Sequence, residues 1–164
     1  MDIGIRVSRA AVDLFRGTQG LPAVVGTLAE EASISAPAFH ADQVTMANIA
    51  AELAEKAVVT RYPLVNLYCD RVTNQLREKF RRFSGKVRMV AEARVSHARL
   101  EGIESASHLL SDAVTEVLDA SRGDWGNGMF FTGGYEITYG PVKSGGKNFL
   151  QITKIAFEVD VSAD

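Results

Sequence analysis

Two stretches of this sequence alternate apolar and polar side chains, and this pattern constrains the fold more than any other feature of the chain. Apolar residues occupy every second position from Val87 to Val95, with Arg88, Glu92 and Arg94 among the residues between them. The same alternation returns in the closing stretch from Phe149 to Val161. Successive side chains of a strand point to opposite faces of a sheet. Both stretches are therefore predicted to be strands, and the first is predicted to leave its charged face in water.

Helical periodicity is clearest between Glu101 and Ser121. Apolar residues recur there every three or four positions, and Gly123 follows at a position that commonly closes a helix. Weaker stripes of the same kind predict three further helices in the first third of the chain, over residues 3–14, 22–32 and 42–57.

The remaining elements complete the predicted fold. An apolar run at residues 64–69 predicts a buried strand, and residues 135–139 alternate as a strand does. The stretch 70–83 fits either a helical stripe or an extended arm between two strands. The order of elements predicts an α+β domain with a mostly antiparallel four-stranded sheet and a helix packed on one face. A helical lead-in over residues 1–60 would precede this core over residues 61–164, all in one compact unit.

The composition is that of one domain without disulfides. A chain of 164 residues that is 46% hydrophobic can bury a core of its own. Cys69 is the one cysteine and lies in an apolar run, so packing in the interior is predicted. The chain shows neither a basic, apolar leader nor a long apolar span, and an intracellular protein without a membrane partner is expected.

Charge is distributed along the chain in two blocks. Although the net charge is only −2, the stretch from Arg71 to Arg99 is strongly basic. It contains nine basic residues, and its acidic residues are Glu78 and Glu92. The stretch from residue 100 to 128 is acidic instead, with six acidic residues and Arg122 as its basic residue. Two opposed patches suit a subunit that pairs head to tail with copies of itself, as in a ring.

Basic and aromatic residues are interleaved in the basic block, and this admits three interpretations. The pattern suits docking to another subunit or partner, a solvated face, or contact with nucleic-acid phosphates and bases. The residues concerned are Arg77, Lys79, Phe80, Arg81, Arg82, Phe83, Lys86 and Arg88.

No motif predicts catalysis, a cofactor or a metal. The glycines at 123–128 follow a helix, whereas a dinucleotide-binding turn opens one. In the stretch 140–148, Pro141 stands where a phosphate loop has its first glycine, and Asn148 stands where it has a hydroxyl. The three histidines show no metal-ligand spacing with one another or with Cys69. We expect a protein that is not an enzyme, with no catalytic, cofactor-binding or metal-binding residues.

Several segments together resemble the tail terminator, or tail completion, proteins of long-tailed bacteriophages. The resemblance covers roughly residues 62–161. It is carried by the order of the runs YPLVNLY (62–68), EKFRRFSG (78–85), the strand from Val87 to Ser96 with its following helix, GDWGNGMFFTGGYEI (123–137), the Gly145-Gly146 loop, and the strand from Phe149 to Val161.

The resemblance implies a structural virion protein. Members of this family form a hexameric ring that caps the head-proximal end of the tail tube, stops its polymerisation and joins the tail to the neck, while DNA passes through the lumen. It thus implies a homo-hexamer whose partners are the tube protein, a neck or connector protein and genomic DNA bound without sequence specificity, located in the virion tail and assembled in the host cytoplasm. A head–tail connector or neck protein is the alternative, and a small ligand-binding enzyme is a more remote one.

The site residues expected from this resemblance lie in two groups. The first would face a neighbouring subunit or the lumen, and comprises Arg77, Lys79, Arg81, Arg82 and Lys86 with the complementary Glu101, Glu104, Asp112 and Asp119. The second would contact the tube or a neighbour, or would instead fold back on its own sheet, and comprises Trp125, Met129, Phe130 and Phe131.

Overall fold

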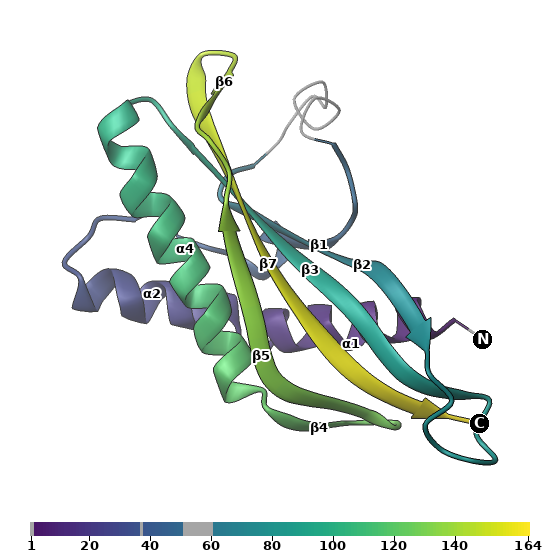
Figure 1. Cartoon of the computed structure of the whole chain (residues 1–164). Helices are drawn as coiled ribbons and strands as arrows, with labels where there is room; N and C mark the ends of the chain where they lie inside the picture. Colours follow the sequence, from purple (N-terminus) through teal and green to yellow (C-terminus); the bar gives the residue numbers. More distant parts are fainter. Residues whose placement is uncertain (1, 37, 51–60) are drawn as a thin grey trace.

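The computed structural model describes residues 2–36, 38–50 and 61–164 (Figure 1). Its elements in chain order are α1 (Ile3–Arg16), α2 (Leu21–Glu31), the 3-10 turn η1 (Ala41–Gln43), β1 (Val44–Met46), β2 (Leu64–Asn74), β3 (Phe83–His97), α4 (Leu100–Ala120), β4 (Gly123–Gly126), β5 (Met129–Tyr139), β6 (Lys143–Gly145) and β7 (Asn148–Ala163).

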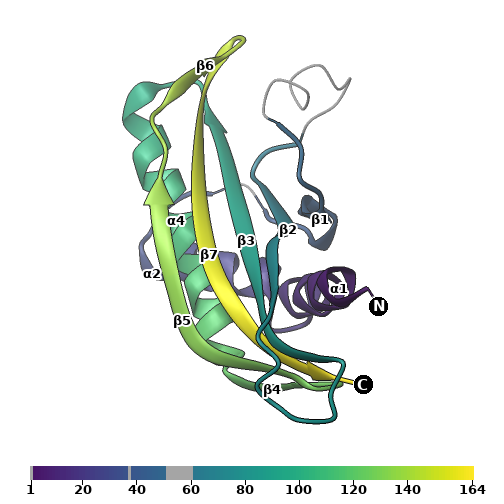
Figure 2. The same ribbon diagram turned by 45° about the vertical axis from the view of Figure 1, so that its right-hand side comes forward.

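The described strands form one mixed sheet, and the prediction of four mostly antiparallel strands with one helix is wrong. The sheet has seven strands in the order β1-β2-β3-β7-β5-β4, with β6 paired to β7 beside this path. β1 runs parallel to β2 and every other pairing is antiparallel. Figure 2 shows how the long strands curl the sheet into a half-barrel. The extra strands β1, β4 and β6 are three or four residues long, too short for a sequence period to reveal them.

Three α-helices in the described part of the chain accompany the sheet. α1 packs against β2 and β1, α4 packs against β3 and β7, and α2 packs mainly on α4 (Figures 1 and 2). Their apolar stripes share one cluster with the inward residues of the sheet, which include Val87, Met89, Ile155 and Phe157. The predicted helices at 3–14, 22–32 and 101–121 are thus confirmed to within a few residues, as is the closing strand. Gly123, predicted to close the last helix, instead begins β4 with a φ of +113°.

The charged face of β3, which carries Arg88, Glu92 and Arg94, is also largely removed from solvent. The prediction that this face is exposed to water is therefore wrong. Arg88 is half-buried, while Glu92 and Arg94 are buried. Arg94 is 1% exposed, and its Nε and Nη2 donate to Glu92 Oε1 at 3.0 and 2.7 Å. Its Nη2 also donates to the carbonyl of Ile49, which places the segment before residue 51 over this face. The segment that buries this face is distant from β3 in the sequence, so the alternating pattern within β3 could not indicate the burial.

Two further predictions are resolved between residues 42 and 83. The helix predicted over 42–57 is wrong where it is described, because residues 44–46 form β1 beside Val65 of β2, and residues 51–57 lie outside the described part. In the ambiguous stretch 70–83, the extended alternative is confirmed. β2 continues to Asn74, a loop follows, and β3 begins at Phe83.

Candidate interaction sites

The loop that joins β2 to β3, residues 75–82, is here called the arm. Side chains at its base hold it in place: Asn74 Oδ1 accepts hydrogen bonds from the backbone N–H groups of Leu76 and Ser84, at 3.2 and 3.1 Å. The Ser84 hydroxyl accepts another from the backbone N–H of Glu78 at 3.2 Å. A Cβ added to Gly85 would lie 2.0 Å from the Thr73 carbonyl oxygen, so the close approach of the two strands requires glycine there. The arm is therefore an ordered projection.

Two large apolar side chains on the arm face solvent from a strained backbone. Phe80 is fully exposed and Leu76 is 64% exposed. Their φ angles are +70° and +46°, in the left-handed region that bulky residues rarely adopt. Such strain costs about 1–3 kcal/mol per residue and clusters at functional sites. Phe80 in this conformation lies outside the core formed by the described residues.

The predicted basic residues divide between ion-paired and free side chains. Arg81 pairs with Asp164 at 2.5 Å and Glu78 at 3.6 Å, and the hydrogen bond that its guanidinium donates to Asp164 raises the pKa of Arg81 above its ordinary value. Lys86 pairs with Glu158 and Asp160 across the sheet. Arg77, Lys79 and Arg82 form no ion pair with any described residue. The arm thus carries positive charge that the described part of the chain leaves without an ion-pair partner.

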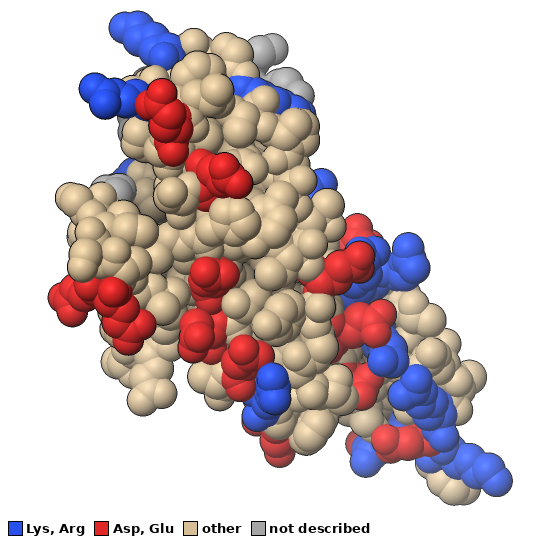
Figure 3. Space-filling model, turned by 60° about the vertical axis from the view of Figure 1, so that its left-hand side comes forward, with Lys and Arg blue, Asp and Glu red and all other residues tan. Residues whose placement is uncertain are grey.

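The acidic residues predicted to complement this charge lie on the outer face of α4. Glu101, Glu104, Asp112 and Asp119 are all exposed. Asp119 pairs with Arg122 at 3.0 Å, and Glu104 approaches His108 at 3.9 Å. No ion pair joins these four carboxylates to the arm within the described chain. Figure 3 shows acidic side chains scattered over the broad face, some basic ones at its upper end, and basic side chains interleaved with acidic ones at the tapered lower end.

Of the aromatic group after α4, most side chains fold back on their own sheet. Phe131 is fully buried, Met129 is buried, and Trp125 packs against the core with its ring centroid 5.7 Å from that of Phe131. The indole N–H of Trp125 donates to the Ser121 carbonyl at 2.7 Å. Phe130 is exposed at 49%, as the alternation of a strand requires. Phe130 is therefore the member of this group that lies open for a tube or neighbour contact.

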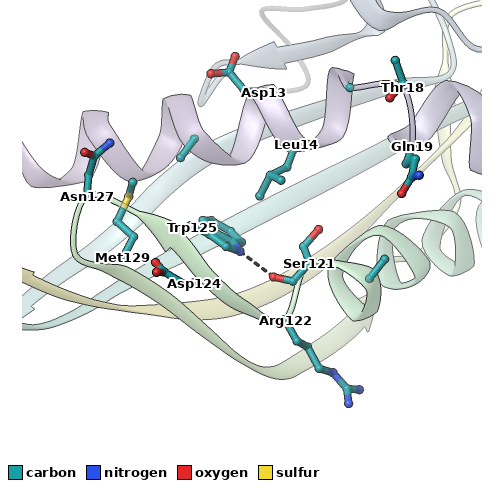
Figure 4. Close-up of a pocket in the computed structure, with 13 residues that line it drawn as sticks. Asp13, Leu14, Thr18, Gln19, Ser121, Arg122, Asp124, Trp125, Asn127 and Met129 are labelled. Atoms are coloured by element: carbon teal, nitrogen blue, oxygen red, sulfur yellow. Dashed lines mark hydrogen bonds between the residues drawn. The ribbon is translucent and has the colours of Figure 1, made fainter.

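A groove runs between α1 and β4, and sequence reasoning missed it. Its volume is about 710 Å³, and its lining includes Ala10, Leu14, Trp125 and Met129 (Figure 4). Asp13 and Asp124 also line it, with Arg122 as the one basic residue among the described lining. Because α1 and β4 lie more than a hundred residues apart in the chain, no local pattern could have revealed the groove.

The groove continues along α2 and α4. A second hollow of about 400 Å³ shares Thr18 and Gln19 with the first and is also lined by Leu28, Glu31 and Glu116. Neither acid there forms an ion pair with a described residue. We call both hollows together the acidic groove.

A third hollow is apolar and lies between α2, β3 and the first half of α4. Its volume is about 420 Å³, and Val25, Ile34, Val95 and Leu110 line it. Its lining also includes the imidazole of His97, whose Nδ1 already accepts from the backbone N–H of Arg99 at 2.9 Å.

The other chemical candidates lie in structural settings. Burial raises the pKa of the Cys69 thiol, the opposite of what an activated nucleophile needs, and the thiol faces Gly4 of α1. Tyr68 donates to Glu92 Oε2 at 3.1 Å, and burial, followed by the negative charge of Glu92, raises its pKa to about 12. Among the described residues no three His, Cys, Asp or Glu side chains cluster as a metal site. In the same part of the chain no helix has the length and apolar character to cross a membrane.

No protein-family model matches the sequence, and no curated protein matches it.

Proposed function

We propose that this protein is a structural virion subunit that assembles into a homo-hexameric ring. The ring caps the head-proximal end of a phage tail tube, terminates its polymerisation and joins it to a neck protein, with DNA passing through the lumen. The proposal starts from the resemblance of residues 62–161 to tail terminators. It needs a contact element on the subunit surface and a complementary surface elsewhere.

The arm is the observation that carries the proposal. Phe80 is fully exposed on an ordered loop, has a φ of +70°, and packs in no core of the described residues. Large apolar side chains displayed in this way are typical of residues that bury themselves in a partner. A structural protein whose activity is assembly requires such a feature, whereas a monomeric enzyme does not.

The separation of charge favours identical subunits joined head to tail. Positive charge is concentrated on the arm, and unpaired acids lie on α4 and in the acidic groove. When one patch of a subunit meets a different patch of the next, the contact repeats until it closes into a ring or extends as a filament. A closed hexamer is the outcome that the terminator resemblance implies.

Native mass spectrometry tests the assembly. The expected result is a species of six times the 17.8 kDa chain mass, seen by negative-stain electron microscopy as a ring with a central channel. A twelve-subunit ring would favour a connector or neck protein instead. A chain that remains monomeric at every accessible concentration would contradict the proposal.

Binding to tail tubes tests the capping role. Tubes from long-tailed phages are incubated with the purified protein and imaged by electron microscopy. Rings seated at one end of the tube, with further growth arrested, are the expected result. Rings that bind along the tube wall, or tubes that lengthen equally with and without the protein, would contradict a capping role.

A further inference from the structure

The arm and the acidic groove complement each other in charge. Within residues 75–82, four basic side chains stand against the single acid Glu78. The described lining of the acidic groove carries four acids, Asp13, Glu31, Glu116 and Asp124, against the single base Arg122. Opposite excess charges on two separate surfaces favour their association over pairing either surface with itself.

The two surfaces also complement each other in apolar character. Phe80 presents its whole ring to solvent, and Leu76 is exposed beside it in the arm. The floor of the groove contains Leu14, Met129 and the half-buried ring of Trp125, which is fixed by its bond to the Ser121 carbonyl (Figure 4). A volume of about 710 Å³ accommodates an aromatic side chain together with a neighbouring guanidinium. Trp125 offers an aromatic face both to a phenyl ring and to a cation.

The arm of the same chain does not fill its own groove. Arg81 pairs with Asp164, and the Ser162 hydroxyl donates to Glu78 Oε2 at 2.9 Å, so the arm is held against the end of β7. Phe80 is fully exposed in that position. An occupant of the acidic groove that carries the arm's chemistry must therefore come from another molecule.

We infer that the arm of one subunit docks in the acidic groove of the next, with Phe80 seated beside Trp125 and the free charges of Arg77, Lys79 and Arg82 facing Asp13, Glu31, Glu116 and Asp124. The occupant is a second copy of this chain. This inference rests on the proposed ring, and names the contact by which it closes. Because arm and groove are different surfaces, each subunit gives one arm and receives another.

Removal of the aromatic anchor is the first test. Phe80→Ala leaves the fold intact, since the ring touches nothing in its own chain, and the midpoint concentration for assembly in sedimentation velocity rises by about tenfold or more. Tyr135→Ala removes an exposed aromatic residue outside the arm, the acidic groove and the candidate tube contacts, and leaves that midpoint unchanged. A Phe80→Ala protein that assembles as the unaltered chain does overturns the arm contact but leaves the ring itself standing. A monomeric unaltered chain overturns both.

Mixing two defective variants tests the head-to-tail logic. One variant carries Phe80→Ala with Arg77→Glu, so that its arm fails. The other carries Gln19→Arg with Glu116→Arg, at two exposed groove positions, so that its groove fails. Each alone is expected to be monomeric, and an equimolar mixture yields a one-to-one heterodimer that grows no further. A mixture that stays monomeric, or variants that still form rings alone, overturns the inference.

Photo-crosslinking locates the contact directly. Phe80→p-benzoylphenylalanine keeps an aromatic ring at the tip of the arm. After irradiation, mass spectrometry is expected to find it joined to peptides spanning residues 10–19 or 120–129 of another copy. Crosslinks confined to other segments overturn the assignment of the groove. The same probe placed by Tyr135→p-benzoylphenylalanine, at an exposed position outside the candidate contacts, controls for nonspecific capture.

Discussion

The two ends of β3 use basic residues in opposite ways. Towards its C-terminal end, Arg94 is 1% exposed and donates both Nε and Nη2 to the carboxylate of Glu92. At the other end the arm holds Arg77, Lys79 and Arg82 in solvent with no ion pair to a described residue. All of them belong to one basic run of the sequence. The difference shows that a run of basic residues does not by itself indicate which side chains are exposed or what they do. That depends on which other segments of the fold pack over them.

The largest expected effect comes from breaking the buried pair. Arg94→Met leaves the Glu92 carboxylate buried without its guanidinium, and the free energy of unfolding is expected to fall by about 3–5 kcal/mol. Arg82→Met on the arm is expected to change it by less than about 0.5 kcal/mol. Urea denaturation measures both. Equal losses would erase the contrast between the two ends of β3.

The same pair offers a sharper control. Replacing both partners, as Glu92→Leu with Arg94→Met, removes the unpaired charge along with the ion pair. The double variant is expected to recover most of the loss of Arg94→Met, because a buried ion pair contributes little beyond what apolar packing supplies. A double variant as unstable as the single one would show that the pair itself, rather than the orphaned carboxylate, sets the stability.

The base of the arm is expected to be sensitive to added volume. Gly85→Ala forces a Cβ against the Thr73 carbonyl oxygen, 2.0 Å away, and is expected to destabilise the fold by about 1–3 kcal/mol. Gly134→Ala is the matched control, since an added Cβ there meets no atom within 4 Å. Thermal unfolding of both variants checks the result. A stable Gly85→Ala protein would mean that the arm shifts freely on its two strands.

The phenol of Tyr68, which donates to Glu92, is expected to lose its proton at an unusually high pH. Tyr68 is expected to ionise at about pH 12, above the ordinary 10.0. Between these two values the unfolded chain has lost a proton that the folded chain still holds, so stability declines as the pH rises through this window. Phenolate absorbance of the unaltered chain, compared with Tyr68→Phe, isolates this step. A Tyr68 step near pH 10 would contradict burial beside Glu92.

The smallest expected effect lies on the sheet surface between the two ends. Lys86 meets Glu158 at 3.1 Å, with both side chains partly exposed. A double-mutant cycle of Lys86→Met and Glu158→Gln is expected to give a coupling of about 0.2–1 kcal/mol that falls in concentrated salt. A coupling above that range, independent of salt, would place Lys86 with the buried residues instead.

Where local pattern and burial agreed, the sequence predicted individual helices and strands, although the predicted four-stranded architecture was wrong. The apolar stripes of α1, α2 and α4, and the alternation of β7, lie on faces that pack as their periods indicate. β3 also appeared as a strand, but its charged face was assigned to water. The carbonyl that receives Arg94 comes from Ile49, far away in the sequence, so no local signal could reveal the cover.

The interaction sites were predictable only in part. The sequence shows that residues 77–82 are basic and aromatic, and these residues lie in the arm. Phe80 is fully exposed, whereas Phe83, three residues later, is buried. This difference depends on where β3 begins, which the sequence pattern did not define. The acidic groove arises where α1 meets β4, and only the fold brings these elements together.

The pairing of β3 with β7 has a mechanical consequence. Every residue from Phe83 to His97 has a partner on β7, without a break in register, and the arm emerges directly from one end of this ladder. A pull on the arm along the strand direction loads these hydrogen bonds in shear, so they must fail together instead of opening one at a time. We expect a subunit held by its arm to resist tension along this axis better than across it, which single-molecule pulling from position 80 in the two directions would measure.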